Sequence, residues 1–217
     1  MLLYYITDRT QFPGDENARR IAVLANIAEA ATWGVDYVQL REKDLPTREL
    51  ESLANAALRT IEQNSQSGNG RTRTRLLINS RVDVAMVCGA DGVHLRSEDI
   101  SPNDVRRVWS ARRSDVPVIG VSCHSVGDVA RAASERADFA VLAPVFEKKD
   151  TPGAPATGLS ALREACHQSI PVLALGGVNL ENARSCIEAG AAGVAGIRLF
   201  QRGNLSEVVR LLRSKTT

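Results

Sequence analysis

Hydrophobic residues along this chain fall into two alternating patterns, which predict alternating strands and helices. In one pattern they form short, nearly uninterrupted runs, which are typical of buried strands in a parallel sheet. In the other they recur at helical spacing within longer segments, as do Ile21, Leu24, Ala25 and Ala28. The predicted strands are Leu2–Ile6, Tyr37–Leu40, Leu76–Asn79, Gly92–Leu95, Val118–Ser122, Phe139–Leu142, Val172–Leu175 and Val194–Ile197. The predicted helices are Ala18–Trp33, Thr47–Asn64, Arg81–Cys88, Ser101–Arg112, Ser125–Arg136, Leu159–His167, Asn179–Ala189 and Leu205–Ser214.

A short phrase recurs four times where a predicted helix ends and a strand begins. It consists of Gly-x-Asp, or a close variant, followed by apolar residues. Glycine ends a helix well because it adopts the left-handed backbone conformation without steric cost. The repetition therefore indicates that helices and strands alternate throughout the chain. The copies are Gly34–Val38, Gly89–Val93, Ala137–Val141 and Gly190–Val194.

Eight strand–helix units in 217 residues fit a compact (β/α)₈ TIM barrel, an α/β fold, with one domain spanning residues 1–217. The main alternative is a doubly wound open sheet. Its dinucleotide-binding form is disfavoured, because no Gly-x-Gly-x-x-Gly follows the first strand. In a barrel we expect the functional residues at the carboxyl ends of the strands.

Composition and charge exclude several classes of partner. The net charge of +2 gives no reason to expect nucleic acid or a membrane surface. No apolar stretch approaches the roughly 20 residues that span a bilayer, and the apolar start lacks the basic region of a signal peptide. The four cysteines have no CxxC spacing, so neither zinc nor a disulfide framework is expected. We expect a cytoplasmic enzyme with reduced thiols; its oligomeric state stays open, a homo-oligomer included.

The second predicted strand leads into Gln39, Arg41 and Lys43, which share one face because side chains alternate along a strand. Leu40 and Glu42 take the other face. A polar face with two cations suits an anionic ligand, since arginine binds phosphate oxygens in a bidentate manner and lysine adds a point charge. Alternatively, Arg41 and Lys43 already lie beyond the strand and are solvated.

Polar residues also follow the fourth and fifth predicted strands. Asp99 is a candidate magnesium ligand near a phosphate site, although an acid placed before the helix start at Ser101 is an equal interpretation. His124 is a candidate proton donor or phosphate ligand, with a structural role as the alternative. His94 lies within a strand, which predicts a place in the core.

Glycines mark the ends of the seventh and eighth predicted strands, at Gly176, Gly177 and Gly196. They allow backbone N–H groups to approach a phosphate closely, and the loops after these strands are the usual phosphate site of such barrels. Together with the cationic second strand they give two anion sites. Two sites imply one substrate with phosphate at both ends, or two phosphorylated substrates.

The chain resembles the thiamine phosphate synthase/TenI family over nearly its whole length. The resemblance rests on Gln39–Lys43, Leu77–Asn79, Gly89–His94, Gly120–Ser125 and Leu175–Gly177 in combination. The family is a (β/α)₈ barrel. Its synthases join a hydroxymethylpyrimidine diphosphate to a thiazole phosphate and release diphosphate, which would supply the two phosphorylated substrates.

The resemblance also implies roles for individual residues, with His124, Lys43 and Arg41 as the catalytic group. The diphosphate would bind Gln39, Arg41, Lys43 and Asn79, with Mg²⁺ held partly by Asp99. The thiazole phosphate would bind at Gly176, Gly177 and Gly196, and Ser122 lies in a matching motif as a further substrate-binding residue.

Four departures from the synthase pattern fall at the diphosphate end. Ser80 replaces an aspartate, Arg96-Ser97 replaces Gly-Gln, Phe146–Thr151 within the irregular loop Phe146–Gly158 replaces a threonine-rich loop, and Arg198 replaces a serine. Lys148 and Arg198 are candidate replacement cations. The departures leave open a TenI-type thiazole tautomerase that needs no metal, in which His124 moves the proton, or a non-catalytic binder of thiamine precursors.

Overall fold

The computed structural model describes residues 1–65, 73–147 and 156–214. Eight parallel strands pair in chain order, and β8 pairs with β1 to close the barrel. The strands are β1 (Leu2–Ile6), β2 (Tyr37–Leu40), β3 (Arg75–Asn79), β4 (Gly92–Leu95), β5 (Val118–Cys123), β6 (Phe139–Leu142), β7 (Val172–Ala174) and β8 (Gly193–Gly196). The predicted TIM barrel is therefore confirmed, and every predicted strand lies within one residue of its observed bounds.

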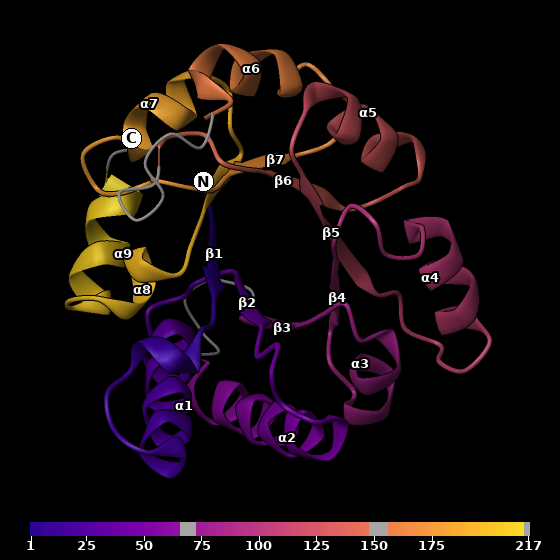
Figure 1. The fold of residues 1–217 in the computed structure, drawn as a ribbon, viewed down its shortest axis with the longest axis vertical. Coiled ribbons are helices and arrows are strands. Elements are labelled where there is room, and N and C mark those ends of the chain that lie inside the picture. Colours follow the sequence, from indigo (N-terminus) through magenta and orange to yellow (C-terminus); the bar gives the residue numbers. More distant parts are fainter. Residues whose placement is uncertain (66–72, 148–155, 215–217) are drawn as a thin grey trace.

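Helices surround the strands as an outer ring (Figure 1). They are α1 (Glu16–Thr32), α2 (Thr47–Asn64), α3 (Val82–Cys88), α4 (Pro102–Ser110), α5 (Val126–Ser134), α6 (Gly158–Ala165), α7 (Ala183–Glu188), α8 (Arg198–Gln201) and α9 (Leu205–Ser214), with a 3₁₀ turn η1 (Arg9–Gln11) after β1. The sequence pattern did not predict η1 or α8, which are too short to show periodicity.

The buried face of α1 differs from the predicted one. Ile21 is 60% exposed, whereas Val23, Ile27 and Ala30 are fully buried. Leu24 is partly buried against the core, so the buried face overlaps the apolar spacing without coinciding with it. The helix is rich in alanine, so several of its faces are almost equally apolar. Packing against the strands and α2, rather than the sequence pattern, selects among them.

The recurring Gly-x-Asp phrase has a clear structural role. Its aspartates precede β2, β4 and β6, and each carboxylate accepts a hydrogen bond from a backbone amide of the preceding odd-numbered strand. The pairs are Asp36 with Leu3 at 2.7 Å, Asp91 with Leu76 at 2.8 Å, and Asp138 with Ile119 at 2.7 Å. The fourth copy has Ala192 in this place, which bonds β7 only through its backbone.

The glycine of this phrase is used for its left-handed conformation. Gly34, Gly89 and Gly190 have φ values of 75°, 73° and 101°. The third copy lacks the glycine, and Arg136 takes the same conformation with φ of 65°. The phrase thus ends a helix and links two strands at the amino-terminal rim of the barrel.

Large side chains fill the barrel interior below the carboxyl-terminal rim. The rings of Tyr4 and Tyr37 pack on Phe139, with centroids 5.3 and 5.1 Å from it. Gly120 provides the room, because a Cβ there would lie 2.5 Å from the Phe139 ring. This packed layer forms a floor, so a ligand enters from the carboxyl ends of the strands.

Candidate active site

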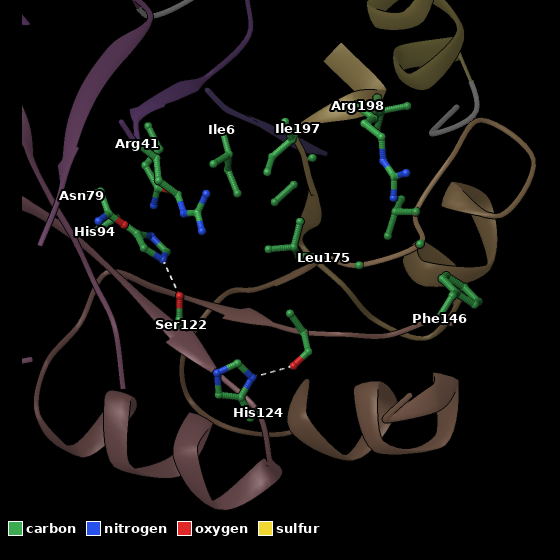
Figure 2. Close-up of a pocket in the computed structure, with 18 of the residues that line it drawn as sticks. Ile6, Arg41, Asn79, His94, Ser122, His124, Phe146, Leu175, Ile197 and Arg198 are labelled. Atoms are coloured by element: carbon green, nitrogen blue, oxygen red, sulfur yellow. Dashed lines mark hydrogen bonds between the residues drawn. The ribbon is translucent and has the colours of Figure 1, made fainter. Parts of the chain in front are cut away.

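A cavity of about 1060 Å³ opens above this floor, where the carboxyl ends of the strands meet. Ile6, Leu175 and Ile197 form apolar parts of its wall, while polar and cationic side chains reach it from several strands (Figure 2). Arg41 and Arg198 lie on opposite sides of the pocket in this view. The cavity therefore has cationic groups at two separate places.

The end of β2 supplies the first cationic group. Gln39 is 1% exposed, and its amide donates to the Tyr4 hydroxyl at 3.1 Å. Arg41 and Lys43 follow the strand end and both line the cavity. Burial lowers the pKa of Arg41, and the charge of Arg41, together with burial, lowers the pKa of Lys43. This mutual repulsion is relieved when an anion binds between the two cations.

The opposite face of the same segment anchors it. Glu42 is buried, and it accepts hydrogen bonds from the Thr7 hydroxyl at 2.5 Å and the Arg9 guanidinium at 3.2 Å. Arg9 also pairs with Asp44 at 2.7 Å. The Thr7 hydroxyl accepts from the backbone N–H of Arg41 at 3.0 Å, which fixes the start of the cationic segment.

A chain of hydrogen bonds crosses the floor to Ser122. The Tyr4 hydroxyl lies 3.1 Å from Nδ1 of His94. Nε2 of His94 lies 2.8 Å from the Ser122 hydroxyl (Figure 2). Because Gln39 donates to Tyr4, the tyrosine proton is directed to Nδ1, and Nε2–H then donates to Ser122. The Ser122 proton is left to point into the cavity as a donor.

His94 is held neutral in this chain. Burial lowers its pKa to about 3, and the charge of Arg41 acts in the same direction. The unfolded chain binds a proton near pH 6.5, so between these two values the unfolded state carries more protons. The free energy of unfolding should therefore fall as the pH is lowered through this interval.

We expect His94→Gln to flatten this pH dependence by up to about 1.4 kcal/mol per pH unit. Urea unfolding at several pH values across the interval measures the slope. His167→Gln, at an exposed position after α6, is the control and should keep the wild-type slope. Identical slopes for wild type and His94→Gln would contradict a buried neutral imidazole.

Asn79 lines the cavity, but Asp99 is not among the lining residues. The Asp99 carboxylate accepts from the backbone N–H of Arg96 at 2.7 Å and from the Arg96 guanidinium at 3.0 Å. Ser101, not Asp99, caps α4 through the amide of Asp104. Asp99 therefore holds the turn after β4, a role that neither sequence interpretation included.

This corner does not fit a resident magnesium ion. The Asp99 carboxylate is occupied by Arg96, and the neighbouring position holds Ser80, whose hydroxyl is a weak ligand by comparison with a carboxylate.

His124 lies at the rim beyond β5. Its Nδ1 is 2.8 Å from the carbonyl oxygen of Ala143, which can only accept, so Nδ1 carries the proton (Figure 2). In the neutral ring Nε2 is the acceptor. Because His124 is exposed and lines the cavity, this nitrogen is available for proton transfer.

The glycines after β7 are required by close packing. Gly176 and Gly177 have φ values of 91° and 67°. A Cβ on Gly176 would lie 2.7 Å from Pro144, and one on Gly177 would lie 2.7 Å from Phe146. These glycines therefore allow the loop after β6 to approach, and their predicted role in binding a phosphate stays a prediction.

The cavity gathers most of the predicted site residues: Gln39, Arg41, Lys43, Asn79, Ser122, His124, Gly176, Gly177, Gly196 and Arg198. Lys148 lies outside the described residues. Sequence reasoning did not include Arg96 and Arg202, which also line the cavity. Arg96 stood out only as a departure from the family pattern, and nothing in the sequence marked Arg202.

A closed parallel barrel with a polar, cationic cavity at the carboxyl ends of its strands defines a TIM barrel with its candidate site at the usual rim. The sequence matches the family model described as thiamine monophosphate synthase over residues 3–200. The chain therefore belongs to the thiamine monophosphate synthase family, as the resemblance implied.

Individual relatives agree with this assignment. The thiamine-phosphate synthase of Methanoculleus marisnigri is 38% identical over 220 residues, which cover 98% of this chain and 94% of that protein. The thiamine-phosphate synthase of a Roseiflexus species is 35% identical over 196 residues, which cover 89% of this chain and 75% of the relative. The structure of a thiamine phosphate pyrophosphorylase from Pyrococcus furiosus has a TM-score of 0.79 at 27% identity, covering 99% of this chain and 94% of that one.

Proposed function

We propose that the protein is an enzyme of thiamine biosynthesis, a transferase of the thiamine-phosphate synthase type. It joins hydroxymethylpyrimidine diphosphate to thiazole phosphate and releases diphosphate. The observation that carries the proposal is the single cavity with cationic groups on two sides, in a chain of this family. One side would take the diphosphate and the other the thiazole phosphate.

The diphosphate end is proposed at β2 and β3. Arg41 and Lys43 would bind the phosphate oxygens, with Gln39 and Asn79 as neutral hydrogen-bonding groups. The carbon–oxygen bond to the pyrimidine methylene breaks, and its electron pair leaves with the diphosphate. The two cations stabilise the charge that develops on the leaving group.

The thiazole phosphate end is proposed at the loops after β7 and β8. Gly177 and Gly196 line the cavity there. Arg198, which the sequence departures placed at the diphosphate end, lies on the side of the pocket opposite Arg41 (Figure 2) and is assigned to the thiazole phosphate end instead. A phosphate held at this end places the thiazole ring across the cavity from the leaving group. The lone pair of the thiazole nitrogen then forms the new bond to the methylene carbon, and positioning supplies much of the rate.

Ser122 would orient the pyrimidine between these two ends. The hydrogen-bond chain from Gln39 fixes its hydroxyl as a donor, which suits a ring nitrogen with a lone pair.

Within the described residues, no helix is long and apolar enough to cross a membrane. A cytoplasmic location, the single-domain organisation and the oligomeric state stay predictions from the sequence.

One observation favours a second activity, the aromatisation of a thiazole carboxylate phosphate tautomer. His124 directs Nε2 to the rim, because its Nδ1 is fixed by the Ala143 carbonyl, and in the neutral ring Nε2 is the acceptor. Such a group accepts a proton from one atom and returns it to another. This activity would use the thiazole phosphate end alone.

A paired assay tests both activities. Purified protein is supplied with pyrimidine diphosphate and thiazole phosphate, and separately with the thiazole tautomer. We expect thiamine phosphate to form in the first assay. His124→Ala should abolish aromatisation, where wild type shows it, and reduce synthase turnover only a few-fold.

His167→Ala, at an exposed position outside the cavity, is the matched control and should change neither rate. Equal losses in both reactions for His124→Ala would contradict this division of roles. Absence of thiamine phosphate with wild-type protein would overturn the proposed function.

A further inference from the structure

Arg96 extends the cationic side of the cavity beyond β2. It follows β4 directly, lines the cavity, and keeps its side chain 64% exposed. Asp99 lies behind it, with a side chain only 11% exposed. The acid is therefore set back in the wall and the guanidinium lies toward the solvent-filled pocket.

Asp99 is committed to this arrangement. Its Oδ1 accepts from Nε and Nη2 of Arg96 at 3.2 and 3.0 Å, and its Oδ2 accepts from the backbone N–H of Arg96 at 2.7 Å. Burial would raise the pKa of Asp99, but hydrogen bonds from Ser80 and Arg96 outweigh it and lower the pKa. The carboxylate is thus charged, and a metal ion at Oδ1 would compete with the guanidinium for that oxygen.

Arg96 also acts on the other two cations of this side. Its charge contributes to lowering the pKa of Lys43, after the larger effects of Arg41 and burial. Three cations therefore lie within electrostatic reach of one another. The Nη1 group of Arg96 makes no hydrogen bond to any residue in the described part of the chain, so it has donors available for an anion.

We propose that the guanidinium of Arg96, positioned by Asp99, is the third cation of the diphosphate site and occupies the place that a divalent ion would need. The site would then bind diphosphate without a resident metal. This inference rests on the proposed function, because it assumes that Arg41 and Lys43 bind a diphosphate group. A guanidinium suits the role, since its planar donors match phosphate oxygens and its charge does not titrate.

Calorimetric titration with inorganic diphosphate in EDTA tests the proposal directly. Wild-type protein should bind the anion without any divalent ion, and Arg96→Gln should bind it about tenfold more weakly, as expected for one charge-assisted hydrogen bond. The matched control is Arg107→Gln. Arg107 makes a similar i,i+3 pair with Asp104, but it does not line the cavity, so its variant should bind as wild type does.

Titration with MnCl₂ alone gives a second measurement that does not depend on turnover. Wild type should show no saturable manganese binding. The double variant Ser80→Asp with Arg96→Gly should gain it, because it frees Asp99 and adds a carboxylate where the Ser80 hydroxyl faces it. Aspartate tolerates the left-handed backbone at this position, where φ is 59°. Circular dichroism confirms that each variant is folded.

Two results would overturn the inference: diphosphate binding by wild type only with added divalent ion, or equal affinity for wild type and Arg96→Gln. The experiments also distinguish failure of the proposed synthase function from failure of the inference about Arg96. If no thiamine phosphate forms but diphosphate binds in EDTA through Arg96, the synthase assignment fails and the anion site stands. If thiamine phosphate forms with a strict metal requirement and Arg96→Gln is unaffected, only the inference fails.

Discussion

Arg41→Ala should reduce kcat/KM for thiamine phosphate formation by about 10²–10³, mainly through kcat. The Arg41 guanidinium lies half-buried in the cavity, where burial lowers its pKa and strengthens its interaction with an anion. The attraction between the Arg41 guanidinium and the diphosphate grows as negative charge builds on the leaving group. Removing the guanidinium therefore destabilises the transition state more than it weakens substrate binding. Steady-state kinetics with both substrates varied gives the two constants separately.

Arg41→Lys is the informative companion variant. It keeps the charge but loses the bidentate geometry, so we expect its activity to fall between those of wild type and Arg41→Ala. Arg131→Ala provides the control, because Arg131 pairs with Asp128 on α5 and does not line the cavity. A loss in Arg41→Ala confined to KM, with kcat unchanged, would contradict a role in stabilising the leaving group.

Arg9→Met should lower the free energy of unfolding by about 3–5 kcal/mol, the largest stability effect that we expect in this chain. Arg9 is 3% exposed, and Glu42, its partner, is 5% exposed. Removing the guanidinium leaves a buried carboxylate whose pKa is already raised by burial, against hydrogen bonds from Thr7 and Arg9. Urea unfolding at neutral pH measures the loss.

The double variant Arg9→Met with Glu42→Gln should recover part of this stability, because it removes the unpaired charge. Arg184→Ala is the comparison, since Arg184 forms an exposed i,i+4 pair with Glu188 and should change stability little. If Arg9→Met were no more destabilising than Arg184→Ala, the buried pair would not be what anchors the end of β2.

Much of this architecture was predictable because it depends on local patterns. Strand alternation placed Gln39 on the inner face and Glu42 on the outer face, and the structure confirms both positions. The barrel rule placed the predicted site residues at one rim before any contact was known. The buried face of α1 was not predictable, because helical spacing alone does not choose between similar apolar faces.

The sequence-based prediction of side-chain contacts was least successful for side chains that have more than one possible hydrogen-bond or ion-pair partner. Asp99 could have faced the cavity or the turn after β4, and hydrogen bonds to Arg96 decide for the turn. Arg9 and Glu42 are 33 residues apart and share no motif, so their pairing arises only from the tertiary fold. The prediction for Lys148 concerns a residue outside the described part of the chain.

The aspartates of the repeated phrase divide the barrel into quarters. They join β1 to β2, β3 to β4 and β5 to β6 over sequence separations of 33, 15 and 19 residues. The pairing of β8 with β1, by contrast, joins residues that are separated by almost the entire chain. Short separations cost less loop-closure entropy, so each pair can assemble early and locally. The pair β7 and β8 has a link of similar length but with Ala192 in place of the carboxylate, so we expect its amide protons to exchange with solvent before those of the other three pairs.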